Sequence, residues 1–135
     1  MDHRQTIQNS LDYIENNLKT EIFPQELANL AGYSLYHYYR VFRSATGMGV
    51  TQYILRRRLL HAIYDISLGG KRIDIVLSYG FESYSSFYKS FLRELGCTPS
   101  DYLHHHRAKP PYRFNLFKEE LMEITPKKAR EILKA

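Results

Sequence analysis

Apolar residues recur every three or four positions along most of this chain, with polar residues between them. In the first such segment the apolar positions are Ile7, Leu11, Ile14 and Leu18. This spacing places the apolar side chains on one face of an α-helix. No segment alternates apolar and polar residues for long enough to indicate a β-strand. The pattern therefore predicts an all-α protein of about seven helices.

Glycine, proline and serine residues separate the periodic segments and set the expected helix limits. Pro24 is typical of a helix start, Ser34 and Ser83 are typical N-caps, and Gly47 and Gly96 are typical of helix ends. The predicted helices cover residues 5–18, 24–31, 35–46, 50–66, 73–79 and 84–95, followed by a short helix that starts at Thr98-Pro99 and runs through Leu103.

The two helices that follow Ser34 and Ser83 belong to an internal repeat. The matching pairs, each 49 positions apart, are Ser34 and Ser83, Arg40 and Lys89, Phe42 and Phe91, Gly47 and Gly96, and Tyr53 and Tyr102. Each copy consists of a helix, a glycine turn followed by an aromatic residue, and a second helix, which is typical of a helix-turn-helix. A plain αα-hairpin is the alternative for a single copy, but two copies with aligned caps and cations favour the helix-turn-helix.

The second helix of each copy is expected to expose aromatic, polar and basic side chains once its apolar face is packed. The outward residues are Tyr36, Tyr39, Arg40 and Arg43 in the first copy and Tyr84, Ser85, Tyr88, Lys89 and Leu92 in the second. Arginine can bond both major-groove acceptors of a guanine, and tyrosine and serine can contact bases or phosphates. The alternative is that the tyrosines are ordinary surface or core residues of an amphipathic helix.

The charge distribution favours the same kind of partner. The 135 residues carry a formal net charge of +5 and include 12 Tyr and 7 Phe. The net charge is −3 over residues 1–34, +5 over 35–107 and +3 over 108–135. A small basic domain points first to nucleic acid, although an evenly solvated surface remains the alternative for charge alone.

Several other classes of protein find no support in the sequence. Cys97 is the one cysteine, which excludes an intrachain disulfide and a multi-cysteine metal site. The run His104-His105-His106 is not expected to bind metal, because consecutive residues on an ordered element do not face one site. We find no catalytic signature, so we predict neither enzyme activity nor a cofactor. No apolar run or secretory signal indicates a membrane or export, and we expect a cytoplasmic protein.

Three stretches of the chain resemble the DNA-binding region of the AraC/XylS family of transcription regulators. They are LANLAGYSLYHYYRVFRSATG, YILRRRLLHA and IDIVLSYGFESYSSFYKSFLRELGCTPSDYL. The string GF-x-S-x-x-x-F-x-K-x-F is the most specific part, and the resemblance extends over residues 7–103. It implies seven helices, with two helix-turn-helix units joined by a long helix. It also implies sequence-specific binding of double-stranded DNA, with the two recognition helices in successive major-groove segments.

The resemblance assigns roles to particular residues. The implied base-reading residues are Tyr36, Tyr39 and Arg40 in the first unit and Tyr84, Ser85 and Lys89 in the second. Residues expected to hold phosphates are Arg43 and the helix caps Ser34, Ser83 and Thr98, whose helices offer backbone amides at their starts. Arg58 also matches a commonly basic position, and two roles stay open for it: phosphate contact or internal support of the long helix.

Four positions depart from the usual family pattern. Val76 replaces the common alanine of the fifth helix, and Gly49 replaces the common serine before the long helix. Lys89 stands where arginine is commoner and Leu92 where a phosphate-binding cation is frequent. Since lysine does not form the paired hydrogen bonds that arginine makes, we expect weaker or less base-specific contact by the second unit.

The expected domain organisation is a DNA-binding domain over residues 5–106 and a linker or tail over 107–135. The domain consists of one helix-turn-helix over about 24–46, the long helix over about 50–66 and a second helix-turn-helix over about 73–96. We expect residues 113–135 to be dispensable for DNA binding. The tail is consistent with the start of a missing effector domain, and a stand-alone regulator is the alternative. A small-molecule effector is expected only if such a further domain exists.

A module that binds another protein, such as RNA polymerase, is the alternative function. The arginine-bearing outer helix faces favour DNA over that alternative, because the core of a protein interface is usually depleted of lysine and rich in apolar side chains.

Overall fold

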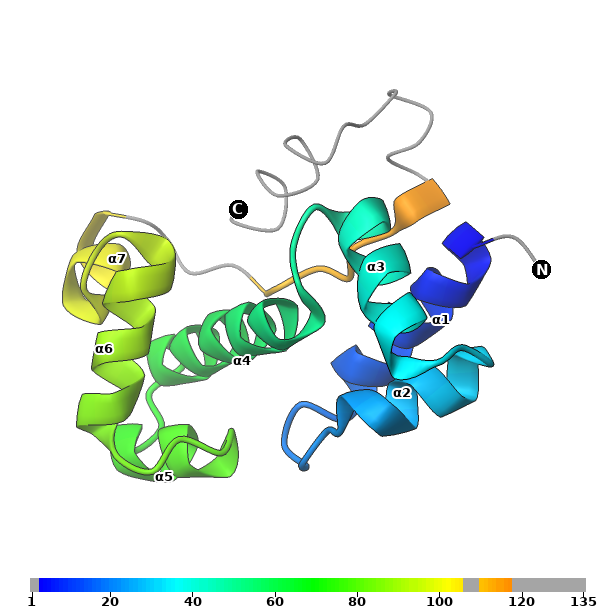
Figure 1. Ribbon diagram of the computed structural model, residues 1–135. Helices are drawn as coiled ribbons and strands as arrows, with labels where there is room; N and C mark the ends of the chain where they lie inside the picture. The colour runs from blue at the N-terminus through cyan, green and yellow to red at the C-terminus, as the bar shows by residue number, and fades with distance from the viewer. Residues whose placement is uncertain (1–2, 106–109, 118–135) are drawn as a thin grey trace. The chain divides into compact units, whose positions relative to one another are not determined.

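The computed structural model describes residues 3–105 and 110–117, and within those ranges its regular secondary structure consists of helices joined by turns and loops, with no strand (Figure 1). Its helices are α1 (His3–Asn16), α2 (Pro24–Ala31), α3 (Leu35–Thr46), α4 (Val50–Ser67), α5 (Arg72–Ser78), α6 (Tyr84–Leu95) and α7 (Pro99–His105). The all-α prediction and all seven predicted helices are confirmed, with ends that differ by two residues or fewer. None of the helices among the described residues is both long and apolar enough to cross a membrane.

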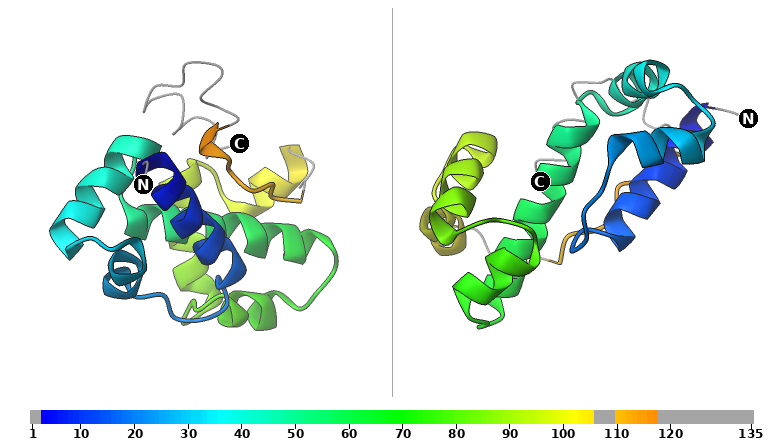
Figure 2. Two further views of the ribbon diagram at one scale, coloured as in Figure 1. Left: turned by 90° about the vertical axis from the view of Figure 1, so that its right-hand side faces the viewer. Right: turned by 60° about the horizontal axis from the view of Figure 1, so that its bottom comes forward.

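The chain divides into two compact units. Among the described residues, unit 1 holds 3–17, 22–54 and 113–117, and unit 2 holds 18–21, 55–105 and 110–112. The continuous helix α4 begins in unit 1 and ends in unit 2 (Figure 2).

Unit 1 is built on the apolar faces of α1, α2 and α3. Their core side chains include Ile7, Leu11, Ile14, Leu27, Ala28, Tyr38 and Phe42, each at most 2% exposed. The ring of Phe42 also meets that of Tyr53 edge-on, with ring centroids 5.6 Å apart. These contacts fix which face of α3 is turned inward and which is left for another partner.

The turn between α2 and α3 follows directly from its residues. Gly32 has φ of +77°, a conformation that glycine adopts without strain. The amides of Gly32 and Tyr33 return to the carbonyls of Asn29 and Ala28 and close the end of α2. Ser34 then starts α3, because its Oγ accepts a hydrogen bond from the amide of His37 at 3.1 Å.

Unit 2 repeats this arrangement with α5 and α6. Phe81, just after the turn glycine, packs edge-on against Phe87 with ring centroids 5.3 Å apart. Phe91 meets Tyr102 of α7 in the same way at 5.5 Å. The fully buried Val76 also belongs to the core of the protein.

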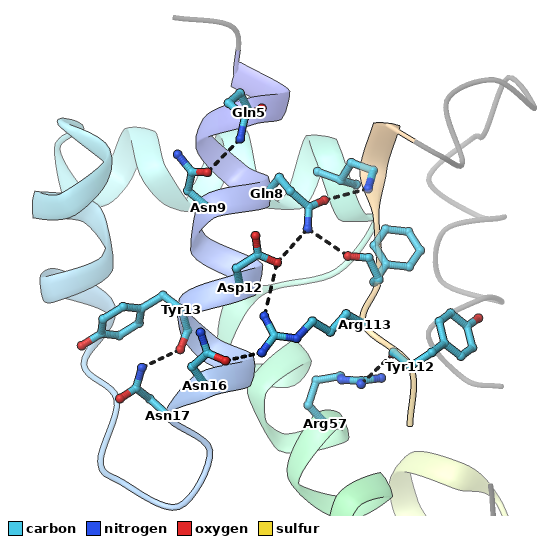
Figure 3. Close-up of polar contacts among 12 residues, drawn as sticks. Gln5, Gln8, Asn9, Asp12, Tyr13, Asn16, Asn17, Arg57, Tyr112 and Arg113 are labelled. Carbon is cyan, nitrogen blue, oxygen red and sulfur yellow. Dashed lines mark hydrogen bonds and ion pairs between the residues drawn. The ribbon is translucent and has the colours of Figure 1, made fainter. Parts of the chain in front are cut away.

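The segment 113–117 packs against α1, although the sequence predicts a linker or tail over residues 107–135. Phe114 and Leu116 are only 2% and 4% exposed. The amide of Gln8 binds both: Nε2 donates to the Phe114 carbonyl at 3.0 Å, and Oε1 accepts from the Leu116 amide at 2.8 Å (Figure 3). Arg113 pairs with Asn16 and lies 3.9 Å from the carboxylate of Asp12. The helix expected to begin near Thr125 lies outside the described residues.

Candidate DNA interface

The outer face of α3 has the aromatic and basic character predicted for a first recognition helix. Tyr36 is 71% exposed and Tyr39 is 41% exposed, and Arg40 is also exposed. The guanidinium of Arg40 lies over the Tyr36 ring, 5.8 Å from its centroid. A cation in that position is attracted to the ring, which restricts the arginine while its donors stay available. The structure therefore brings Tyr36 and Arg40 together as one surface.

Arg43 lies one turn further along the same face of α3 and is exposed. Its Nη2 is so near Gly49 that a Cβ at that position would stand 3.1 Å from it. The absence of a side chain at Gly49 thus leaves room for the arginine. Arg43 is placed as expected for a cation that accompanies Arg40.

The second recognition helix, α6, presents a less basic face. Ser85 and Lys89 are exposed, as predicted, whereas Tyr84 is half-buried. The Tyr84 ring contacts the ring of Phe87, with centroids 5.7 Å apart, and the guanidinium of Arg72 lies over the Tyr84 ring, 5.9 Å from its centroid. The exposed Leu92 adds apolar surface to this face.

Arg72 belongs beside this face but was not among the predicted site residues. It is exposed at the start of α5 and covers the face of Tyr84. The basic pair Lys71-Arg72 at the start of a helix was the available sequence signal. The helical pattern of α5 gave no indication that Arg72 would meet a residue twelve positions later.

The three capping side chains are engaged with their own helices. As Ser34 does for α3, Ser83 accepts from the amide of Ser86 at 3.0 Å and Thr98 accepts from that of Asp101 at 3.0 Å. Each hydroxyl bonds one amide of a first helical turn, where other amides have no partner inside the helix. Such amides favour an anion, so a phosphate would be held by backbone groups rather than by the capping hydroxyls.

Arg58 supports the chain internally. Its Nε donates to the carbonyl of Leu18 at 2.9 Å and its Nη2 to that of Thr20 at 2.7 Å, all within unit 2. Burial lowers the pKa of Arg58, and the carboxylate of Glu21 partly opposes this shift. Of the two roles left open for Arg58, the structure favours internal support.

The neighbouring arginines of α4 are also turned inward. Arg56 is 2% exposed and bonds the carbonyl of Glu94 at 2.5 Å, with the Glu94 carboxylate 3.6 Å away. Arg57 is 4% exposed and donates to the carbonyl of Tyr112 at 2.9 Å. These cations contribute to the net charge of the sequence but have little exposed surface to offer a nucleic acid.

Each unit thus presents a second helix with exposed polar and basic side chains, after a glycine turn that holds it against a first helix. This arrangement defines a helix-turn-helix protein of the DNA-binding class. A family model described as a helix-turn-helix domain matches residues 27–105, which include both units' turns and recognition helices. The chain belongs to the AraC/XylS family of transcription regulators and is a DNA-binding regulator of transcription.

Several bacterial proteins are similar to the chain over more than two thirds of its length. The transcriptional activator AarP of Providencia stuartii is 40% identical over 93 residues, which are 68% of this chain and 69% of AarP. The TetD protein of transposon Tn10, from Escherichia coli, is 37% identical over 101 residues, 74% of this chain and 73% of TetD. The regulatory protein SoxS of Salmonella typhimurium is 34% identical over 105 residues, which cover 77% of this chain and 98% of SoxS.

Proposed function

We propose that one chain binds one asymmetric site on double-stranded DNA, with α3 and α6 reading adjacent major-groove segments. The observation that carries this proposal is the repeat of two non-identical recognition faces, of which α3 presents Arg40 over Tyr36. Since successive major-groove segments are about 10 base pairs apart, the site should cover about 20 base pairs. A footprint that always shows a palindrome occupied by two copies within such a short site would contradict the proposal.

In this proposal the two recognition helices contribute differently. Tyr36, Tyr39 and Arg40 read bases from α3, with Arg40 as the principal reader because it can bond both acceptors of a guanine. Tyr84, Ser85 and Lys89 contact DNA from α6, where the ammonium of Lys89 fits a phosphate or a single acceptor. The phosphate contacts proposed are Arg43 and the first helical turns after Ser34, Ser83 and Thr98.

Two variants test this division of roles. Arg40→Ala should cost about 1–3 kcal/mol on the cognate duplex and relax preference at one or two base pairs. Lys89→Ala should weaken binding evenly across sequences and lower the salt slope by about one. The measurement is affinity for a duplex selected from a random library, and for its single-base variants, over a salt series. The roles are reversed if Lys89→Ala changes base preference and Arg40→Ala does not.

A contact with RNA polymerase is a second proposal, favoured by an apolar pair on α5. Ile73 and Leu77 are four residues apart, share one side of that helix, and are 43% and 48% exposed. Leu77→Ser should leave DNA affinity unchanged and reduce transcription by purified RNA polymerase from a template that carries the site. Equal transcription by both proteins, if the regulator activates this template, would refute the contact.

We further propose a non-enzymatic regulator that acts in the bacterial cytoplasm. Its DNA-reading elements lie within residues 5–106, and the segment 113–117 belongs to the folded part of unit 1. A small-molecule effector would require a further domain beyond the DNA-binding region.

A further inference from the structure

A basic groove lies in unit 1 beside the recognition helix, between the start of α1 and one side of α3. It has a volume of about 360 Å³, and its lining includes His3 and Arg4 from α1 and His37, Arg40 and Ser44 from α3. All five side chains carry nitrogen or hydroxyl donors, and none is acidic. The groove therefore suits a small anionic group better than an apolar one.

Ring contacts hold the two walls of this groove together. The Tyr33 hydroxyl and the His3 Nδ1 are 2.5 Å apart, and the Tyr33 ring meets the ring of His37 edge-on at 4.7 Å. The rings of His3 and His37 are also in contact, with their centroids 5.9 Å apart. The first turn of α1 is thereby tied to the glycine turn and to the first turn of α3. Arg4 itself lies over the ring of Phe117, 6.0 Å from its centroid.

The groove lies on a flank of α3 rather than on its reading face. Successive helical residues are turned by about 100°, so His37 and Ser44 point roughly a quarter-turn away from Tyr36 and further still from Tyr39. Arg40 lies at the boundary between the two directions. An α-helix with its side chains is about 10–12 Å across and the major groove is about 12 Å wide, so the flanks of an inserted helix face the sugar-phosphate strands.

We propose that this groove binds one backbone phosphate of the DNA duplex that α3 reads, with Arg4 as its principal cation. The inference rests on the proposed insertion of α3 into the major groove. Arg4 comes from outside the helix-turn-helix, and the groove places it where the flank of α3 would meet a strand. His3, His37 and Ser44 supply further donors around the same anion. The contact adds affinity and fixes the register of α3 but reads no base.

The test is a double-mutant cycle between Arg4 and single phosphates. The probe is a duplex selected from a random library, in which each phosphate along the half read by α3 is replaced in turn by a neutral methylphosphonate. For the wild-type chain, one or two replacements should weaken binding roughly tenfold, as expected for a charge-assisted hydrogen bond. With Arg4→Gln the same replacements should cost less than about twofold, because the partner is already absent. Arg4→Lys should restore part of the sensitivity.

A matched control is Arg113→Gln, which removes a cation that lies beside the opposite end of α1, near Asp12. It should keep the wild-type pattern of sensitive phosphates, and thermal unfolding should show both variants folded. The inference is overturned if Arg4→Gln leaves the penalty at every phosphate unchanged, even when the selected duplex is still preferred over a scrambled one. If the wild-type chain binds selected and scrambled duplexes equally, the proposed function fails and the phosphate site fails with it.

Discussion

Replacement of Phe114 by alanine should destabilise unit 1, because this side chain is part of its core. Phe114 is 2% exposed, and its carbonyl accepts a hydrogen bond from the buried amide of Gln8. Removal of a buried phenylalanine ring costs about 3–5 kcal/mol in well-packed proteins, through lost burial and the cavity left behind. The segment around Phe114 is short and can relax into the space, so we expect a loss near the lower end, about 3 kcal/mol.

The same experiment has a matched control in Tyr112→Ala. Tyr112 precedes Phe114 by two positions, but its side chain is 56% exposed. Truncation of an exposed side chain usually changes the free energy of unfolding by no more than about 0.5 kcal/mol. The control therefore separates the loss of core packing from the loss of aromatic bulk in this segment.

The assay is thermal and urea unfolding of each variant, with amide exchange at Leu116 as a local probe. A loss of about 3 kcal/mol should lower the unfolding midpoint of unit 1 by roughly 12 °C. The Leu116 amide, which donates to Gln8 in the folded protein, should exchange faster in Phe114→Ala. Equal stability of the Phe114 and Tyr112 variants, together with an unprotected Leu116 amide, would refute the packing of this segment against α1.

Other contacts of the folded chain lead to further predictions. Arg58→Ala should cost about 1–3 kcal/mol of stability, because two hydrogen bonds are lost. If Arg58 supports the fold and does not contact a phosphate, the same variant should leave the salt slope of DNA binding unchanged. Ser34→Ala and Ser83→Ala should each lower the free energy of unfolding by about 1 kcal/mol, because each removes an N-cap. Threonine at either position should retain most of that stability, as judged by thermal unfolding. Burial raises the pKa of Tyr38 to about 12, so the unfolded chain ionises first and stability should fall as the pH rises from about 10 to 12. Urea unfolding over that pH range should show a smaller loss of stability for Tyr38→Phe than for the wild-type chain. Equal losses in the two proteins would contradict the pKa shift.

The helices and their limits could be predicted because their signals are local. Apolar spacing, caps and left-handed glycines act within a few residues, and Gly47 and Gly96 indeed end α3 and α6 with positive φ. The repeat also predicted which faces of α3 and α6 are exposed, since Phe42 and Phe91 occupy equivalent core positions. The DNA-contact roles of the exposed residues remain predictions.

The packing of residues 113–117 could not be predicted from the same signals. Phe114 and Leu116 alternate with polar residues over too few positions to indicate any element, and the Pro pair before them favoured a linker. Their partner is the side chain of Gln8, more than 100 positions away. Such a contact depends on the tertiary fold, and no local pattern in the sequence predicts it.

The charge of the chain was likewise an incomplete guide to its surface. Arg56, Arg57 and Arg58 form the densest basic run of the central region, yet all three guanidinium groups bond backbone carbonyls within unit 2. Their donors satisfy carbonyl groups that other parts of the fold leave without helical partners. Consecutive helical residues point in different directions, so a basic run on a helix can brace several segments at once.

The contrast between the two recognition faces follows from how each is supported. On α3, Arg40 lies over the exposed Tyr36, so ring and cation can reach a groove together. On α6, the repeat places Ser85 where α3 has Tyr36, so Lys89 has no aromatic side chain one turn before it, and the ring of Tyr84 is half-buried against Phe87 and Arg72. A restricted arginine loses less conformational entropy on binding than a free lysine and can form two directed bonds. Sequence preference should therefore come mainly from α3, while α6 adds affinity that depends more on salt than on sequence.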